Sequence, residues 1–480
     1  MSTDLYEGTS KFSLSFPCVY PVCPISIDHT RLYVIGDIIA RYTRSCNREV
    51  VFPLGFHYSG LTAHKFQSDL NADGDNQTKR IFEEIYKCNS YVIKYLKQSP
   101  RNILDYYTYL TIQDFRKINI SADYDEFYTT TTKMYDDFVL NVFEKYKKNK
   151  VLVENGDNFQ LNYNDEDWKN KMFSWAENVR TIRPQEKNGL MNSTEDLSNG
   201  WDILKTEGYG THVKDGRIID SMHDSELLSL YDIINHVSKN VKEFDSADMK
   251  CLFDVLANEH EAGEIPENVS EVLKLMPTSV LIMEEHLKVW FIKKLYLESL
   301  ILEPDYRTQN YFVLGLGMRN GKRMSSSRGT AILLQDLIRL YGAIKARIIL
   351  LMVGGHPSNF YNYDENIANE VETVFQSFKN KINTELVELL KANESVLNRM
   401  MGFQYKHEIE DLIKDAPGVE EIFKKCEKMI IDGNFKQCLL EIMSSVPKQM
   451  RKYGAEDKIK LLYVINYFFE ILIGVNITEI

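Results

Sequence analysis

The sequence predicts an α/β protein, in which helices cover both faces of a parallel sheet and an α-helical bundle follows. The chain has 480 residues, of which 44% are hydrophobic, and this length suffices for two or three domains with cores of their own. Its first fifty residues alternate strand, helix and strand patterns. From about residue 371 onward, amphipathic stretches of helical period follow one another, as in an up-and-down bundle.

The N-terminal stretch has the pattern of a βαβ unit. The alternation in KFSLSF and the apolar run VVF predict two buried strands. Between them, apolar residues recur at helical spacing (Ile35, Ile38, Ile39 and Tyr42). Asp37 and Arg41 lie on the other face of that helix. The first strand therefore delivers a loop to a helix N-terminus, which is where such folds bind phosphate groups.

Four short motifs follow one another in this stretch. They are Phe16-Pro17 with Tyr20, Ser26-Ile27-Asp28-His29, Ile39-Ala40-Arg41-Tyr42-Thr43-Arg44 and Phe52-Pro53-Leu54-Gly55-Phe56-His57-Tyr58-Ser59-Gly60. Without a gap, they resemble the start of leucyl-tRNA synthetases of the archaeal and cytosolic type. That family reads F-P-Y-P-Y, then H-L-G-H, I-A-R-Y-x-R and F-P-x-G-F-H-x-T-G. The resemblance implies a Rossmann-like class I synthetase catalytic domain.

A second motif is Gly321-Lys322-Arg323-Met324-Ser325-Ser326-Ser327-Arg328-Gly329-Thr330. It resembles the family's G-K-K-M-S-K-S-K-G-N. A strand, a Gly-rich basic loop and a helix whose N-terminus faces the loop form a mobile phosphate clamp. Taken alone, a basic Ser-rich loop is also typical of solvated surface.

The resemblance implies three sets of site residues. The catalytic set is His29, Ser26, Arg323, Ser325 and Arg328. The ATP-binding set is Ser26, Asp28, His29, Glu285, Lys322, Arg323, Met324, Ser325 and Ser327. The amino-acid-binding set is Phe16, Tyr20, His57 and Asp224. We predict no metal-ligating residues; the implied cofactors are ATP and Mg²⁺.

Several of these residues have an alternative interpretation. Asp224, in the sequence Asp-Ser before an apolar helix, also suits a helix N-cap. A lone histidine such as His57 is often a structural hydrogen-bond partner, and Glu284 with Glu285 also suits a solvated acidic pair.

The two motifs depart from the family at three positions. Ser26 replaces the first histidine, Asp28 the glycine, and Ser326 a clamp lysine. Two unit charges at about 4 Å and an effective dielectric of about 20 repel by about 4 kcal/mol, so Asp28 opposes a triphosphate beside it. Losing one clamp donor typically costs ~10²–10³ in rate. Lys322, Arg323 and Arg328 offset part of that loss.

The loop that lines the family's amino-acid pocket also differs. Cys18, Val19, Val22 and Cys23 replace Tyr, Pro, Asn and Gly. Because of these differences, the family's preference for leucine does not carry over strictly. The substrate implied by the resemblance is leucine or a similar amino acid.

We expect four segments. Residues 1–150 form the first half of the catalytic domain with connective helices, and 151–340 the second half with the clamp loop. Residues 341–370 form a linker, and 371–480 resemble a shortened anticodon-binding bundle. From the resemblance, we expect that the family's editing domain is missing, leaving a short turn around Asn155-Gly156, and that the C-terminal tRNA-contacting extension is absent as well.

The net charge and the cysteine content indicate which partners and which compartment suit the protein. The net charge is −12, and a protein that grips a long stretch of tRNA usually carries a basic stripe, which disfavours tRNA as a partner. The seven cysteines have no Cys-x-x-Cys spacing and suit a reducing cytoplasm. No apolar run is long enough to span a bilayer, so we expect no membrane partner.

Three functions remain in competition. The first is an amino-acid-activating enzyme that passes the acyl group from the adenylate to a small molecule or carrier protein. The second is a synthetase-like pseudoenzyme that binds a ligand, an RNA or a protein and whose chemistry Asp28 and Ser326 have removed. The third is a minimal enzyme that charges tRNA.

Overall fold

The structure is a computed structural model. It describes residues 11–149, 152–162, 166–167, 170, 174, 180–181, 202–221, 223–225, 227–260, 263–284, 294, 298–299, 301–326, 328–390 and 405–480. The described strands are β1 (Lys11–Ser15), β2 (Glu49–Val51), β3 (Gly55–Phe56), β4 (Tyr128–Thr129), β5 (Leu152–Asn155), β6 (Asn158–Leu161), β7 (Arg180–Thr181), β8 (Leu204–Lys205), β9 (Ile218–Ile219), β10 (Val280–Glu284), β11 (Asn310–Leu314), β12 (Gly317–Arg319), β13 (Lys322–Arg323) and β14 (Tyr361–Tyr363).

The described helices follow in chain order. They are α1 (Ile27–Ser45), α2 (Thr62–Asn71), α3 (Gln77–Arg80), α4 (Ser90–Leu96), α5 (Pro100–Lys117), α6 (Lys133–Lys148), α9 (Leu228–Asn240), α10 (Ser246–Leu256), α11 (Glu267–Leu275), α13 (Leu334–Tyr341), α14 (Ala343–Met352), α15 (Asn366–Leu390), α17 (Lys406–Ile413), α18 (Pro417–Ile431), α19 (Phe435–Leu440), α20 (Val446–Gln449) and α21 (Ala455–Ile473).

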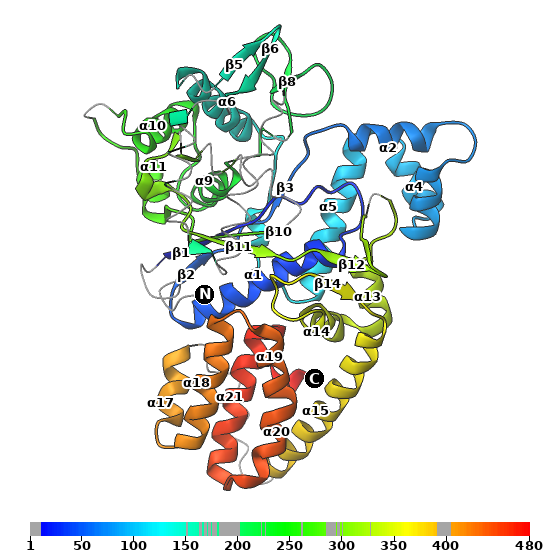
Figure 1. Cartoon of the computed structure of the whole chain (residues 1–480), viewed down its shortest axis with the longest axis vertical. Helices are drawn as coiled ribbons and strands as arrows, with labels where there is room; N and C mark the ends of the chain where they lie inside the picture. Colours follow the sequence, from blue (N-terminus) through cyan, green and yellow to red (C-terminus); the bar gives the residue numbers. More distant parts are fainter. Residues whose placement is uncertain are drawn as a thin grey trace.

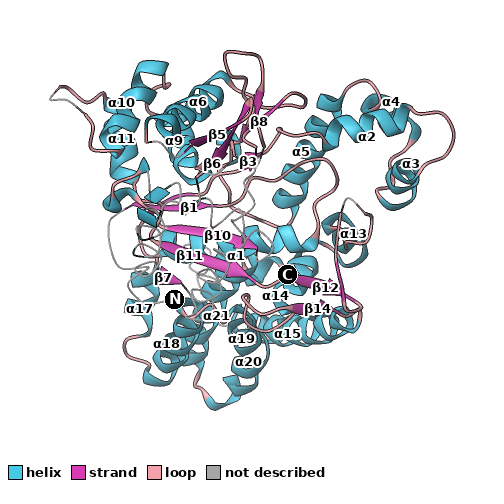
Figure 2. Cartoon of the chain, turned by 45° about the horizontal axis from the view of Figure 1, so that its top comes forward, coloured by secondary structure: helices cyan, strands magenta, loops and turns pink. Residues whose placement is uncertain are grey.

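A five-stranded parallel sheet in the order β2-β1-β10-β11-β7 forms the centre of the molecule. Figure 2 shows β1, β10 and β11 side by side, with α1 beside them. Helix α1 packs on one face of the sheet, and α9 and α11 pack on the other. The predicted fold class, a parallel sheet with helices on both faces, is confirmed.

The alternation of side chains along the strands explains the two layers. In β10, Val280 and Ile282 join the apolar core that contains α1, whereas Leu281 and Met283 join a second core with α6, α9, α10 and α11. Because both faces are covered, Val280 to Met283 of β10 are apolar at every position rather than at alternate ones.

Helix α1 lies between the sheet and the C-terminal helices (Figure 1). Its buried Asp37 accepts hydrogen bonds from Arg41 on the same helix, from Arg347 of α14 and from Ser121. Arg347 also donates to the backbone oxygen of Leu472 at the end of α21. This ion pair therefore fixes α1 against both α14 and the bundle.

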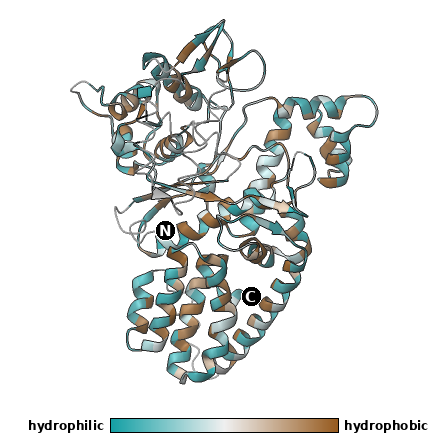
Figure 3. Cartoon of the chain, viewed as in Figure 1, coloured by the Kyte–Doolittle hydropathy of each residue, from teal (hydrophilic) through white to brown (hydrophobic). Residues whose placement is uncertain are grey.

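Helices α15 and α17–α21 form the bundle below the sheet in Figure 1. Figure 3 shows hydrophobic and hydrophilic residues alternating along each of them. Helix α21 is buried along most of its length. Among the described residues, no helix is long and apolar enough to cross a membrane.

A two-stranded hairpin, β5–β6, follows α6 directly. Gly156, at a φ of +59°, makes its turn, at the position predicted for the short turn.

Candidate active site

The turn at the start of α1 lies at the carboxyl edge of the sheet, where ligands bind in open α/β folds. Ser26 is the N-cap of α1, and its hydroxyl accepts a hydrogen bond from the backbone N–H of His29. The same hydroxyl lies 3.1 Å from Nδ1 of His29. Nε2 of His29 is 3.8 Å from the carboxylate of Glu284 at the end of β10, and 46% of the His29 side chain is exposed. Ser26 thus orients an accessible imidazole.

The second motif lies against this turn, although about 300 residues separate the two in the chain. The backbone N–H of Ile27 donates to the oxygen of Ile332 at 3.0 Å, and that of Leu334 donates to the oxygen of Ile25 at 3.0 Å. Between them, Ser26 pairs with Leu333 as an antiparallel bridge. The segment that follows the clamp loop is therefore hydrogen-bonded to the segment that begins α1.

Three cations of the clamp loop are exposed: Lys322 and Arg323 in β13, and Arg328 beyond it. Strand β13 pairs with β12, which in turn pairs with β14, so the basic loop rises from a small three-stranded sheet. Met324 is buried and anchors the loop. The charged ends of Lys322, Arg323 and Arg328 are therefore accessible to an anion.

The tip of the loop is held by hydrogen bonds within the loop and by one from outside it. The oxygen of Ser325 accepts from the backbone N–H of Thr330, and the oxygen of Ser326 accepts from the hydroxyl of Tyr86 at 2.6 Å. Two predicted ATP contacts, Glu285 and Ser327, lie outside the described residues.

Asp28, the residue that replaces the family's glycine, faces inward. Its carboxylate accepts a hydrogen bond from the hydroxyl of Tyr361 in β14. It also lies against Gly317 of β12: a Cβ at Gly317 would be 1.8 Å from Oδ1 of Asp28. Burial raises the pKa of Asp28; the hydrogen bond from Tyr361 opposes this rise and the Glu284 carboxylate adds to it. The carboxylate is therefore sited beside the basic loop and its sheet.

The predicted amino-acid-binding residues His57 and Asp224 are in contact. Nε2 of His57 is 2.9 Å from Oδ1 of Asp224, whose side chain is fully buried. Ser59 donates to the other carboxylate oxygen. The ring of Tyr20 lies 6.0 Å from that of His57. Three of the four predicted residues thus form one group.

The group of Tyr20, His57 and Asp224 differs from the sequence-based expectation in two ways. Helix α9 begins at Leu228 and its N-cap is Leu227, so Asp224 is not the helix cap. Ser59 was not among the predicted site residues, although it lies two positions after His57 in the same motif.

Phe16 lies apart from these residues, in the core. It is 4% exposed and stacks on Tyr33 at 4.7 Å and on Phe52 at 5.3 Å between ring centroids. Its role in amino-acid binding stays a prediction.

A buried polar network lies behind the group, and sequence reasoning missed it. Asp232 of α9 accepts hydrogen bonds from the hydroxyls of Ser15 and Tyr128, and Sγ of Cys18 lies 3.4 Å from the same Tyr128 hydroxyl. Burial raises the pKa of Asp232 to about 7, although both hydroxyl groups lower it. The loop in which Cys18 replaces the family's tyrosine therefore packs against buried polar side chains.

The chain is similar in sequence to archaeal leucine–tRNA ligases. It is 35% identical over 154 residues to the enzyme of Thermoplasma acidophilum, and 31% identical over 171 residues to that of Thermoplasma volcanium. A leucine–tRNA ligase 2 of Sulfolobus acidocaldarius is 33% identical over 141 residues. These matches cover 31%, 34% and 29% of this chain but only 17%, 18% and 14% of the relatives. No family model matches the chain.

In structure, the chain resembles methionyl-tRNA synthetase of Mycobacterium tuberculosis in complex with methionyl-adenylate. The TM-score is 0.68 at 12% identity, over 98% of this chain and 93% of the other. A second structure of that synthetase, also bound by methionyl-adenylate, gives a TM-score of 0.64. The chain therefore has the fold of class I aminoacyl-tRNA synthetases and, over about a third of its length, is a homologue of archaeal leucine–tRNA ligases.

Proposed function

We propose that this protein activates an amino acid with ATP, forming an aminoacyl-adenylate and pyrophosphate. The observation that carries the proposal is the pairing of Ser26 with Leu333, which joins the His29 turn to the segment after the basic loop. In such a reaction, the substrate carboxylate attacks the α-phosphate in line and pyrophosphate leaves. Catalysis then consists chiefly of positioning and of stabilising charge on the phosphate oxygens.

The residues supply donors for both tasks. His29, oriented by Ser26, is accessible to a phosphate at the N-terminus of α1, where the helix dipole favours an anion. Lys322, Arg323 and Arg328 are exposed cations that would neutralise the departing pyrophosphate. Mg²⁺ would accompany ATP.

The amino acid would bind at Tyr20, His57 and Asp224. The buried carboxylate of Asp224 suits an ammonium group, and His57 and Ser59 hold it in one orientation. The substrate proposed from the relatives is leucine or a similar amino acid.

We further propose that the acyl acceptor is a small molecule or a carrier protein rather than tRNA. The net charge of −12 supports this, because tRNA binding requires many cations to neutralise phosphates. The free thiols of all seven cysteines suit a cytoplasmic location.

One observation favours a second candidate function, a binding protein without chemistry. The carboxylate of Asp28 is held by Tyr361 against Gly317, close to the place proposed for the nucleotide. If that contact persists, it excludes ATP, and the fold serves to bind another ligand.

ATP–pyrophosphate exchange over all twenty amino acids tests the proposal. We expect exchange with leucine or a similar amino acid, and a loss of ~10²–10³ in rate for His29→Ala. The matched control is His212→Ala, which removes an exposed histidine bonded to the backbone of Gly216. Absence of exchange with every amino acid, together with absence of ATP binding, would refute activation and leave the second candidate.

A filter assay with total tRNA tests the acceptor separately. Charged tRNA would overturn the acceptor proposal while leaving activation in place.

A further inference from the structure

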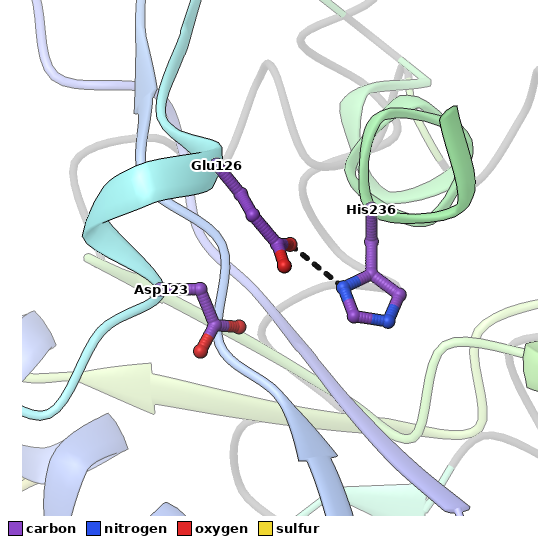
Figure 4. A group of neighbouring side chains, drawn as sticks. All are labelled: Asp123, Glu126 and His236. Carbon is purple, nitrogen blue, oxygen red and sulfur yellow. Dashed lines mark hydrogen bonds and ion pairs between the residues drawn. The ribbon is translucent and has the colours of Figure 1, made fainter. Parts of the chain in front are cut away.

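A group of potential metal ligands lies away from the candidate active-site residues. Among the residues that the structure describes, Asp123, Glu126 and His236 form one group whose ligand atoms all lie within 4.8 Å of one another. Figure 4 shows the imidazole and the Glu126 carboxylate pointing toward one another, with the Asp123 carboxylate beside them. Asp123 comes directly before a short 3₁₀ turn (Tyr124–Glu126), and Glu126 is the last residue of that turn. His236 lies on α9. Two segments far apart in the chain thus contribute the three side chains.

Residues around the group hold the carboxylates in place. One oxygen of Asp123 accepts from the backbone N–H of Phe52 at 2.7 Å, and one oxygen of Glu126 accepts from the amide of Asn240 at 2.6 Å. The second oxygen of Glu126 contacts His236, and the second oxygen of Asp123 lies near Arg44. Outer hydrogen bonds of this kind orient the ligands in metal sites and tune their affinity.

The separations of the ligand atoms, 2.7 Å for one pair and at most 4.8 Å for all, span the separation that a zinc ion requires. Zn–N and Zn–O distances of about 2.0–2.2 Å place tetrahedral ligand atoms about 3.3 Å apart. Nδ1 of His236 and Oε2 of Glu126 are 2.7 Å apart, joined by a hydrogen bond in which a metal ion would replace the proton. A guanidinium nitrogen of Arg44 lies 3.7 Å from Oδ1 of Asp123 and is the cation that a metal would displace.

We propose that Asp123, Glu126 and His236 form a binding site for a divalent transition metal, Zn²⁺ in the first instance. One imidazole and two carboxylates favour zinc over Mg²⁺, which prefers oxygen ligands alone. The side chains are 24%, 20% and 17% exposed, so water would complete the coordination. The ion would clamp α9 to the edge of the sheet, because Asp123 is bonded to the residue that follows β2.

Metal analysis after dialysis against Zn²⁺ tests the proposal. We expect one equivalent of zinc in the full-length protein, and a cobalt-substituted form with a visible d–d absorption band. His236→Ala and Glu126→Gln should lose the ion, and Asn240→Ala should weaken binding by about 10–100-fold. His212→Ala, a matched histidine control, should retain it. Zinc that survives both His236→Ala and Glu126→Gln, or no retained zinc at all, would overturn the proposal.

A measurement on the unmodified chain covers the case in which a variant does not fold. Diethyl pyrocarbonate labels accessible histidines, and mass spectrometry locates the label. Zinc should protect His236 but not His212. Equal labelling of His236 with and without zinc would also overturn the site.

Discussion

Replacement of Asp28 tests most sharply how the altered turn affects nucleotide binding. Asp28→Asn removes the charge but keeps the size and the hydrogen bond from Tyr361, whereas Asp28→Gly also removes the side chain from Gly317. Two unit charges about 4 Å apart repel by about 4 kcal/mol at an effective dielectric of about 20. At 1.4 kcal/mol for each factor of ten, the dissociation constant of ATP should fall by up to about 10³-fold. The glycine variant should bind ATP at least as tightly as the asparagine variant.

The pH dependence follows from the same residue. Since burial raises the pKa of Asp28, lowering the pH protonates it and removes the repulsion. ATP affinity of the natural chain should therefore rise as the pH falls, and the Asp28→Asn variant should lack this part of the dependence.

Isothermal titration with ATP and Mg²⁺ between pH 4 and 8 measures both effects. Asp457→Asn is the matched control, because Asp457 also lies in the first turn of a helix. Identical ATP dissociation constants for the natural chain and both Asp28 variants at pH 8 would show that the carboxylate does not oppose the nucleotide.

Three other predictions concern buried charges. Arg347→Met breaks the buried pair with Asp37 and should lower the free energy of unfolding by about 3 kcal/mol in urea denaturation; an unchanged midpoint would contradict this. Burial raises the pKa of Asp37, but Arg41 and Arg347 outweigh it and hold that pKa at about 2, so this stabilisation should be lost as the pH falls from about 4 to 2. Asp232, with its pKa raised to about 7, binds a proton in the native state, so stability should fall as the pH rises from about 4 to 7. The free energy of unfolding of Asp232→Asn should therefore exceed that of the natural chain by up to about 4 kcal/mol at pH 8 and match it near pH 4. Equal free energies of unfolding at pH 8 would refute the buried charge. Asp224→Asn should raise the KM for the amino acid in the exchange assay by about 10-fold while leaving the KM for ATP nearly unchanged, whereas an equal effect on both would place Asp224 elsewhere.

Local patterns predicted the first strand and the first helix, which position the turn at residues 26–29. The alternation in residues 11–15 corresponds to β1, and the apolar spacing from Ile35 to Tyr42 corresponds to α1. These predictions succeed because the periodicity of a strand or a helix is visible in the order of neighbouring apolar and polar residues. The family motifs added what spacing could not, the expectation that Ser26–His29 and the basic loop belong to one site.

Contacts between residues far apart in the chain could not be predicted from the sequence. Asp37 was placed on the polar face of α1, yet it is fully buried, because Arg347 meets it from 310 residues away. Likewise, nothing near Asp28 indicates that Tyr361 and Gly317 will enclose its carboxylate. Such pairings depend on tertiary packing and leave no periodic signal in one sequence.

We propose that a nucleotide binds between the turn at residues 26–29 and the loop at residues 322–328. Hydrogen exchange with mass spectrometry measures this directly, by comparing the chain with and without saturating ATP and Mg²⁺. We predict slower amide exchange in both segments and unchanged exchange in the bundle helices α17 to α19. Unchanged exchange in both segments, or protection confined to another part of the chain, would contradict the claim.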